Sequence, residues 1–219
     1  MSLPSEEYRR FRIEMDEDSK MNGGGTADSF VCDNWIKYHF DEAERKAAEI
    51  GHLLFDKWSG FCRKFIVVGN GPIKRDRLIT GIKHITFYTN SETFELELFK
   101  YETLNQRDAG WRRKKFSENR KAIIYPNFIE LAGEVDIEGE LQLECYRLPL
   151  SNASSTGQFE INAQYHSMLI EFVKSQYYKN KDADVNALAE SVRHERIFMN
   201  YFHGIGGYED EKITIQQEL

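Results

Sequence analysis

The sequence has no run of the about 18 to 20 apolar residues that a membrane-spanning helix requires. Its first residues, MSLPSEEYRR, lack the apolar stretch of a secretion signal. Cysteine is scarce, because only Cys32, Cys62 and Cys145 occur in 219 residues and none of them forms a CxxC pair. An odd number of separated cysteines argues against a disulfide framework and against a thiolate metal site. We therefore expect no membrane segment, a protein that stays where it is made, and reduced, mostly buried thiols.

Catalytic and cofactor-binding motifs are missing as well. The chain contains no GxSxG, GxxxxGKS/T, GxGxxG or HExxH sequence. Its six histidines are never three or four residues apart, which is the spacing that aims two imidazoles from one helix at one metal ion. We therefore expect no enzymatic activity, no cofactor and no metal.

Acidic residues outnumber basic ones by 36 to 29, which gives a net charge of −7. A protein that grips nucleic acid through its phosphates usually has a basic surplus, so tight DNA or RNA binding is not expected. The exception is the run Arg112, Arg113, Lys114 and Lys115, directly after Trp111. Two interpretations of this run stay open: a patch that contacts phosphates or an acidic partner, or a solvated loop or strand edge guarded by charge.

Apolar spacing predicts an amphipathic helix over residues 33–55. Apolar residues recur there at intervals of three and four, the period of one helix face. They are Ile36, Phe40, Ala43, Ala47, Ile50 and Leu54. Asp33 is a suitable N-cap for this helix.

Between residues 61 and 148 the apolar pattern changes to the period of strands. β-branched and aromatic runs alternate with turns such as Gly69-Asn70-Gly71-Pro72. Leu141, Leu143 and Cys145 alternate strictly with polar residues. This pattern predicts a small antiparallel β-domain with one buried face.

Two helices joined by a short turn are predicted after residue 160, so residues 160–203 should form an antiparallel helical hairpin. The second helix is expected to end at the glycines of 204–207. Its expected apolar stripe consists of Val185, Leu188, Val192 and Met199. The predicted fold class is α+β, with an N-terminal helix and this hairpin packed with the β-domain.

Residues 1–22 could form an amphipathic helix, but the glycine run 23–25 follows as a flexible break, so residues 1–27 are expected to be a flexible arm that a neighbour orders. Residues 204–219 are expected to be a mostly polar, flexible tail. In the C-terminal arm Ile213 and Ile215 alternate with polar residues. They form a potential edge strand that could bind a partner.

Acidic side chains offer the one route to a catalytic site. Glu95 and Glu97 are predicted on the same face of one strand with Lys100 nearby, and metal-dependent nucleases use such carboxylates and a lysine. Glu140, near two further glutamates, could belong to a carboxylate pair of a glycosidase. Exposed surface acids explain these residues more simply, but a metal-dependent hydrolase or nuclease stays open as an alternative.

A strand ending in Tyr146, Arg147 and Pro149 precedes Ile161 and a Tyr-His pair that opens a helix. This order, together with the tryptophans of the first helix and of the β-region, resembles the head-to-tail adaptor (connector) proteins of tailed bacteriophages. The matching aromatic, proline and histidine positions are Trp35, Trp111, Tyr146, Pro149, Tyr165 and His166. The resemblance extends over residues 30–203.

That resemblance implies a structural role for a domain of residues 28–203. Adaptor subunits form a ring of identical copies, a dodecamer, under the portal protein of the virion, and tail or nozzle proteins bind the other side. DNA passes through the lumen as cargo, and the protein reaches the virion from the host cytoplasm. The third alternative is a regulatory module that binds an acidic protein through the basic run.

Overall fold

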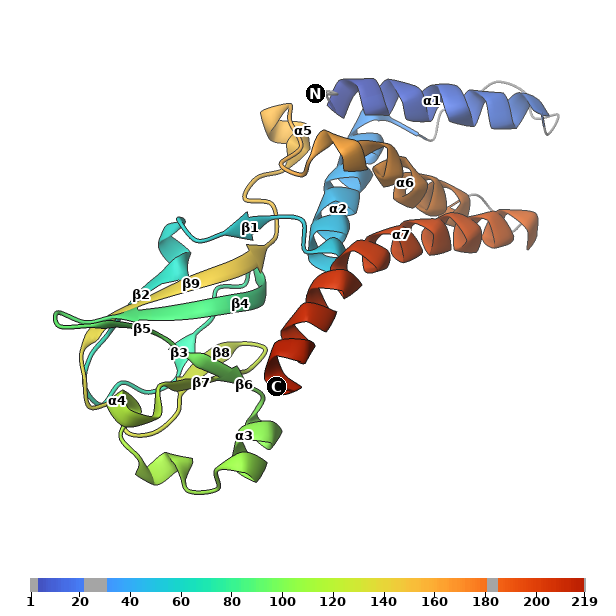
Figure 1. Ribbon diagram of the computed structural model, residues 1–219. Helices are drawn as coiled ribbons and strands as arrows, with labels where there is room; N and C mark the ends of the chain where they lie inside the picture. Colours follow the sequence, from blue (N-terminus) through green and yellow to red (C-terminus); the bar gives the residue numbers. More distant parts are fainter. Residues whose placement is uncertain (1–3, 22–30, 181–184, 219) are drawn as a thin grey trace. The chain divides into compact units, whose positions relative to one another are not determined.

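The computed structural model describes residues 4–21, 31–180 and 185–218, with the backbone alone for 16–21, 185 and 208–218. The chain forms two compact units. Met1–Leu54 and Leu148–Leu219 form the first, here called the helical unit, and Phe55–Arg147 form the second, the β unit (Figure 1). The fold class is therefore α+β, as the sequence pattern predicts.

Long helices build the helical unit. Its elements are α1 (Pro4–Met21), α2 (Asp33–Gly51), α5 (Ala153–Thr156), the 3₁₀ turn η3 (Ala163–Tyr165), α6 (His166–Asn180) and α7 (Val185–Glu218). Aromatic rings dominate the core, where Phe198 lies 5.2 Å from Phe172 and 4.8 Å from Phe202, measured between ring centroids. The predicted hairpin is present as α6 and α7, which are linked by a hydrogen bond from Ser191 Oγ to the Ser175 carbonyl at 2.9 Å.

Helix α2 is shorter than predicted. His52 adopts a left-handed conformation with φ of 50°, which ends the helix at Gly51 instead of continuing it to residue 55. Cys32, not Asp33, is the N-cap, and Asp33 lies in the first turn, where a carboxylate favours the helix dipole. Of the predicted apolar face, Ile36, Phe40, Ala43 and Ala47 are buried and Ile50 is half-buried, while the buried Leu54 lies beyond the helix end.

The N-terminal segment, expected to be a flexible arm, is largely helical. Helix α1 buries Phe11 and Met15 in the core of the helical unit, and the Phe11 ring meets Trp35 and Tyr177. Glu14 forms an ion pair with Lys174 of α6 at 2.7 Å. The sequence allowed an amphipathic helix here, but the glycine run 23–25 after it favoured a flexible arm.

The expected end of α7 at Gly204–Gly207 is wrong, because the helix continues to Glu218. A Cβ atom at Gly206 would lie 2.2 Å from the Ile50 carbonyl oxygen, so this glycine permits a close approach to the end of α2. Packing, not termination, explains the glycine. The predicted edge strand is also wrong, because the backbone of Ile213 and Ile215 is helical; their side chains lie outside the described residues.

Short strands and turns build the β unit. Its strands are β1 (Phe55–Asp56), β2 (Arg63–Ile66), β3 (Ile73–Lys74), β4 (Ile79–Tyr88), β5 (Thr93–Glu95), β6 (Glu97–Phe99), β7 (Lys121–Ile124), β8 (Phe128–Leu131) and β9 (Gly139–Arg147). Its helical turns are η1 (Gly60–Cys62), α3 (Tyr101–Arg107), η2 (Trp111–Arg113) and α4 (Phe116–Asn119). The unit thus begins six residues earlier than the predicted β-region of 61–148.

Two sheets divide these strands. The first has the order β1-β9-β4-β5, with β2 also paired to β9, and the second has the order β3-β8-β7-β6. All pairings are antiparallel except β6 with β7, which is parallel and departs from the prediction. The first sheet buries Ile85, Phe87, Leu141 and Leu143 on one face, as the alternation predicts, whereas the residues of the other face are half-buried or exposed except for the buried Tyr146.

Candidate interaction surfaces

Two buried carboxylates of α2 hold the segment that connects β9 to α6. Asp41 accepts hydrogen bonds from the backbone N–H of Ser154 at 2.9 Å and from its hydroxyl. Glu44 Oε1 accepts the N–H groups of Glu160 at 2.5 Å and Ile161 at 3.2 Å. Burial raises the pKa of Glu44 to about 7, although these two N–H groups favour its charged form. Both carboxylates therefore fix the backbone.

The residues of the adaptor resemblance do not converge on one site. Tyr146 lies on β9 of the β unit, whereas Pro149, Tyr165 and His166 belong to the helical unit. His166 is buried, its Nε2 lies 3.0 Å from the Ile161 carbonyl, and its ring packs on Phe159 at 4.7 Å. These positions act as packing and hydrogen-bonding residues.

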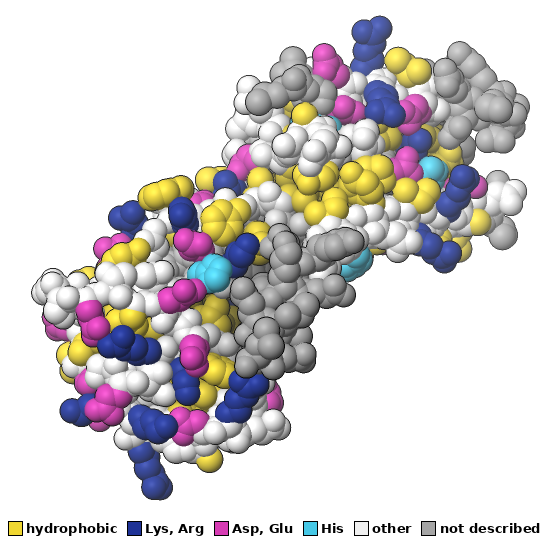
Figure 2. All heavy atoms as spheres, in the orientation of Figure 1, with side chains coloured by type: hydrophobic (Ala, Val, Ile, Leu, Met, Phe, Trp, Pro, Cys, Tyr) yellow, Lys and Arg dark blue, Asp and Glu magenta, His cyan; other side chains and the backbone are white. Residues whose placement is uncertain are grey.

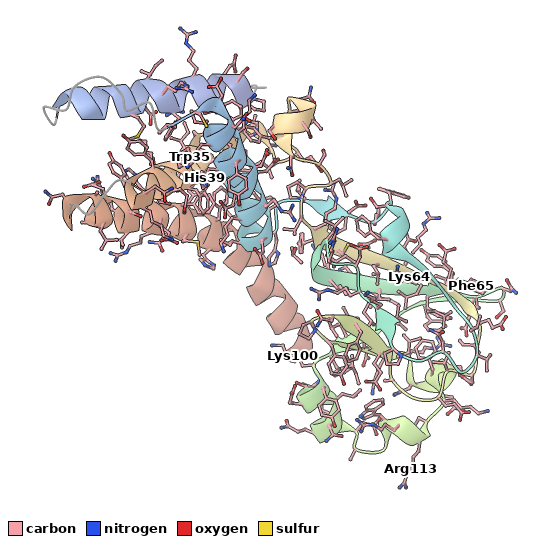
Figure 3. The ribbon with its side chains drawn as sticks, turned by 180° about the vertical axis from the view of Figure 1, so that it is seen from behind. Trp35, His39, Lys64, Phe65, Lys100 and Arg113 are labelled. Atoms are coloured by element: carbon pink, nitrogen blue, oxygen red, sulfur yellow. The ribbon has the colours of Figure 1, made fainter. Side chains whose placement is uncertain are left out.

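Trp35 joins α2 to α1. Its ring stacks on Phe11 and lies 4.2 Å from the ring of His39, one turn further along α2 (Figure 3). Burial lowers the pKa of His39, although the hydrogen bond to Glu42 at 3.1 Å favours the charged ring. This part of the resemblance is again part of the packing.

The first surface that sequence reasoning missed is an exposed apolar segment of the β unit. Trp58 is 73% exposed and Phe65 is 71% exposed. Residues 55–68, here called the aromatic edge, also expose Phe55, Val67 and Val68. Phe65 lies in a strand, where an aromatic residue usually signals core, and its cationic neighbours were the one hint of exposure. Trp58 lies in a turn between the predicted helix and the predicted β-region, where the sequence offered no sign of its role.

A buried aspartate fixes the backbone of the aromatic edge. Asp56 accepts the N–H groups of Trp58 and Ser59 at 2.8 and 3.1 Å, and it pairs with Arg147 Nε at 2.9 Å. Burial opposes ionisation of this carboxyl, but the hydrogen bonds outweigh it and lower its pKa to about 2. Trp58 is therefore presented from a rigid turn.

The exposed face of the first sheet continues this surface. Phe65, Glu140 and Tyr88 lie opposite one another on β2, β9 and β4. Arg63 pairs with Glu140 at 3.7 Å, and Lys57 pairs with Glu144 at 3.5 Å. The face thus combines aromatic rings with nearly balanced charge, which is typical of protein contacts and not of phosphate binding. Figure 2 shows hydrophobic side chains lying between acidic and basic ones on the molecular surface.

The basic run lies in a lobe formed by residues 100–121, here called the basic lobe. Trp111 anchors it, because this side chain is buried with Leu104 and Ile123. The Arg112 guanidinium lies 4.2 Å from the Trp111 ring and 5.4 Å from the Tyr101 ring. Arg112 is therefore held flat by its own lobe.

The other three cations of the run differ in their contacts. Lys114 pairs with Asp108 at 2.6 Å. Within the described part of the chain, neither Arg113 nor Lys115 forms an ion pair, and both are exposed. Arg113 points away from the lobe (Figure 3).

The backbone of the run is fixed by the strand region that follows it. Glu134 N–H donates to the Lys114 carbonyl at 2.9 Å, and Phe116 N–H donates to the Glu134 carbonyl at 2.8 Å. Gly133 has φ of 114°, and a Cβ atom there would lie 2.4 Å from the Lys114 carbonyl oxygen. The run is thus an ordered display of cations on a fixed backbone.

The acidic residues weighed for catalysis are separated. Glu95 lies on β5 of the first sheet and Glu97 on β6 of the second, because the chain changes sheet at the buried Leu96. The predicted common strand face is therefore wrong. Glu95 contacts His84 at 2.5 Å, and Glu140 contacts Arg63. Among the described residues, no group of three or more acidic, histidine or cysteine side chains is arranged to hold a metal ion.

Two of the three cysteines are buried, as expected. Cys62 and Cys145 have their Sγ atoms 3.6 Å apart, and Cys32 is exposed. Burial raises the pKa of both buried thiols. These thiols serve as core residues of the first sheet.

Helix α7 carries the clearest departure from the predicted burial pattern. Its buried stripe consists of Ala187, Ser191, Phe198 and Phe202. Leu188, expected in that stripe, is 62% exposed, and Val192 is also exposed. Two bulky aromatic rings further along the helix determine which face is buried.

The exposed apolar residues of α7 lie on both sides of this stripe. Leu188 and Val192, here called flank A, lie roughly 90° to one side, given 3.6 residues per turn. Ile197 and Tyr201, here called flank B, are exposed roughly 90° to the other side. The helix thus offers two different apolar surfaces to partners.

No protein-family model matches the chain. No curated protein matches it significantly either. Within the described ranges, none of the helices combines the length and the apolar character that a bilayer crossing requires.

Proposed function

We propose that this protein is a structural subunit that assembles with copies of itself into a ring, and that it acts as a head-to-tail adaptor between the portal and the tail of a phage virion. The ring would bind the portal protein on one side and tail or nozzle proteins on the other. DNA would pass through the lumen as cargo. No chemical reaction belongs to this role.

The two apolar flanks of α7 carry the proposal. A closed ring of identical subunits needs two different, complementary surfaces on each subunit, whereas a two-fold dimer needs one self-complementary surface. Flank A and flank B are distinct in composition and lie on opposite sides of the buried stripe. Such a pair fits head-to-tail contacts between neighbouring copies.

The length of α7 also supports an assembly role. It has 34 residues, whereas its hairpin partner α6 has 15, so a large part of α7 extends beyond the hairpin. A helix of that length measures about 50 Å at 1.5 Å per residue. The extra turns would give the subunit reach toward a portal surface.

The aromatic edge supports a further contact on the β unit. Exposed tryptophan and phenylalanine on a rigid backbone are the side chains that dominate binding energy in protein interfaces. Together with the flanks of α7, they give this chain more exposed apolar surface than folding alone explains.

Assembly of the purified full-length chain, alone and with portal rings, tests the proposal by negative-stain microscopy and mass photometry. Wild-type protein should form rings or should add to portal rings as a ring. Leu188→Asp/Val192→Asp and Ile197→Asp/Tyr201→Asp should each remain monomeric, because each removes one half of the contact. Arg196→Asp, exposed on the same helix opposite the buried stripe, is the control and should assemble.

An equal mixture of the two flank variants distinguishes a ring contact from a two-fold contact. The first variant keeps flank B and the second keeps flank A, so one contact can form and the mixture should yield dimers with one copy of each. Dimers of a single variant with itself would contradict the ring geometry. Wild-type protein that never adds to portal rings, or that cleaves a polymer in the presence of divalent metal, would overturn the proposed function.

A further inference from the structure

Charge is distributed unevenly between the two units. The helical unit contains 13 Lys and Arg against 22 Asp and Glu, a net charge of −9, whereas the β unit contains 16 against 14, a net charge of +2. The basic lobe alone contains eight against three, a net charge of +5. By composition, one chain therefore combines an acidic helical unit with a compact cationic lobe.

We infer that the basic lobe docks on the acidic helical unit of a neighbouring copy of this chain, an inference that rests on the proposed ring. Each subunit then donates a lobe to one neighbour and accepts a lobe from the other. This head-to-tail charge pairing guides subunits into the correct orientation and penalises contacts between like units. It acts beside the apolar contacts of α7.

The construction of the lobe favours docking on a surface. Trp111 and the hydrogen bonds to Glu134 fix its backbone, and the Arg112 guanidinium is held between two rings. Arg113 and Lys115 are exposed without an ion pair inside the described part of the chain. Cations on a fixed backbone lose little conformational freedom when they bind. More of the electrostatic attraction therefore contributes to the binding free energy.

The aromatic residues of the lobe argue against single-stranded nucleic acid as the partner. Proteins that bind single strands stack the bases on exposed aromatic rings. Trp111 and Phe116 are both buried, and Arg112 lies over the Trp111 ring and over the half-buried Tyr101 ring.

Part of the positive charge of the lobe is already neutralised, which argues against duplex DNA. Lys114 is paired with Asp108, and Arg120 is paired with Glu92. Arg107 and Lys121 lie over the Phe99 ring, and Arg112 lies over the Trp111 ring. In the described part of the chain, this leaves three of the eight cations without an ion pair or ring contact, namely Lys100, Arg113 and Lys115. Duplex binding commonly uses about six to ten phosphate contacts. A small number of exposed cations on a fixed backbone fits the acidic helical unit of a second copy better than a DNA duplex.

The test compares two full-length variants with the same change in charge. Arg113→Glu/Lys115→Glu reverses two exposed cations of the lobe, and Lys74→Glu/Arg77→Glu reverses two exposed cations of the β unit outside it. Sedimentation velocity at about 50 mM and about 500 mM salt measures self-association at long and short screening lengths. The lobe variant should associate at least about tenfold more weakly than wild type at low salt and should lose the salt dependence. The control variant should keep both properties.

Mixing the lobe variant with wild-type protein tests whether the contact between subunits is head-to-tail. A lobe-reversed subunit still accepts a wild-type lobe on its own helical unit but donates none, so equal amounts of it should shorten wild-type assemblies. Equal weakening by both variants, or a wild type that stays monomeric at low salt, overturns the inference. So does binding of a DNA duplex that the lobe variant loses while self-association is unchanged, because the lobe is then a phosphate site.

These outcomes separate the inference from the proposed function. Rings that form normally with the lobe variant but fail with the α7 flank variants contradict the lobe contact and leave the adaptor role intact. Failure of the wild type to add to portal rings contradicts the adaptor role itself.

Discussion

In the helical unit, Glu44 is buried with two backbone N–H groups as hydrogen-bond donors, and it forms no ion pair among the described residues. In the β unit, Asp56 is buried with similar N–H donors and with the guanidinium of Arg147. The pKa of Glu44 is raised to about 7, whereas that of Asp56 is lowered to about 2. Two N–H groups do not offset the burial of the Glu44 carboxylate. At Asp56 the hydrogen bonds from the Ser59 hydroxyl at 2.6 Å, from the two N–H groups and from Arg147 together outweigh burial.

The same comparison extends to stability against pH. Each unit anchors a turn with a buried acid, and the two anchors respond to pH in opposite directions. The helical unit should lose stability as pH rises through about 7, and the β unit should lose it as pH falls below about 4. Four predictions test this contrast between the units, in order of decreasing effect.

The largest loss of unfolding free energy is expected when a buried aromatic ring is removed from either core. Phe198→Ala removes a fully buried ring of the helical unit, and Phe87→Ala removes one from the β unit. Each should cost about 3 to 5 kcal/mol of unfolding free energy. Hydrogen exchange measured by mass spectrometry should show lost protection mainly in the unit that carries the change, because the two cores consist of different residues. Equal loss in both units would contradict this division.

A smaller effect is expected when Asp56 loses its charge. Asp56→Asn keeps an acceptor for the N–H groups of Trp58 and Ser59 but removes the carboxylate from Arg147, which should cost about 3 kcal/mol at neutral pH. The folded pKa lies below the ordinary value of 3.8, so this stabilisation is present above pH 4 and is lost as pH falls through about 2. Denaturant titrations from pH 2 to 7 should show the two proteins converging at the acid end.

Asp76→Asn is the matched control for this change. Asp76 also accepts a backbone N–H group, that of Leu78 at 2.9 Å, and it has no ion pair in the described part of the chain. It should lose little stability at any pH. A loss equal to that of Asp56→Asn would mean that the hydrogen bonds, not the Arg147 pair, carry the effect.

Glu44→Gln should have an effect of the opposite sign. The folded pKa of about 7 exceeds the ordinary 4.5, so the wild type keeps full stability below pH 4.5 and loses it as pH rises through about 7. The neutral glutamine still accepts both N–H groups. The variant should match wild type near pH 5 and exceed it near pH 8.5 by on the order of 2 to 3 kcal/mol. Glu49→Gln, on the exposed side of α2, should keep the wild-type profile.

Sequence periodicity predicted the α+β class, α2 and the C-terminal hairpin, because apolar residues repeat there at the helical period. The predictions from periodicity failed where the same residue type is compatible with two different structures. Gly206 fits a helix end or a close helix contact, and only the position of the Ile50 carbonyl distinguishes them. Leu188 and Val192 fit a buried stripe until Phe198 and Phe202 determine which face of α7 is inside.

Of the two candidate surfaces on the β unit, one could be predicted from the sequence and one could not. The basic run was visible from the sequence because four adjacent cations in an acidic chain are unusual, although its pairing with Asp108 and its stacking on Trp111 were not. Phe65 was missed, because an aromatic residue in a strand indicates core unless the sheet is known to have one open face. Trp58 was missed because it lies in a turn between the predicted helix and the predicted β-region. Which face of a sheet is buried depends on what packs against it in the tertiary structure. The local sequence says little about that packing.

The smallest change in stability is expected on that open face, and it gives the sharpest comparison. Phe65 and Phe87 lie on strands of the same sheet, but Phe65 is 71% exposed and Phe87 is fully buried. Phe65→Ala and Trp58→Ala should therefore each change the unfolding free energy by less than about 0.5 kcal/mol. Phe87→Ala should cost at least about 3 kcal/mol in the same denaturant titration. A large loss with Phe65→Ala would mean that this ring belongs to the core, and the aromatic edge would then no longer be a candidate surface. A negligible loss leaves two large aromatic side chains without a role in folding, which is the condition for assigning them to a partner.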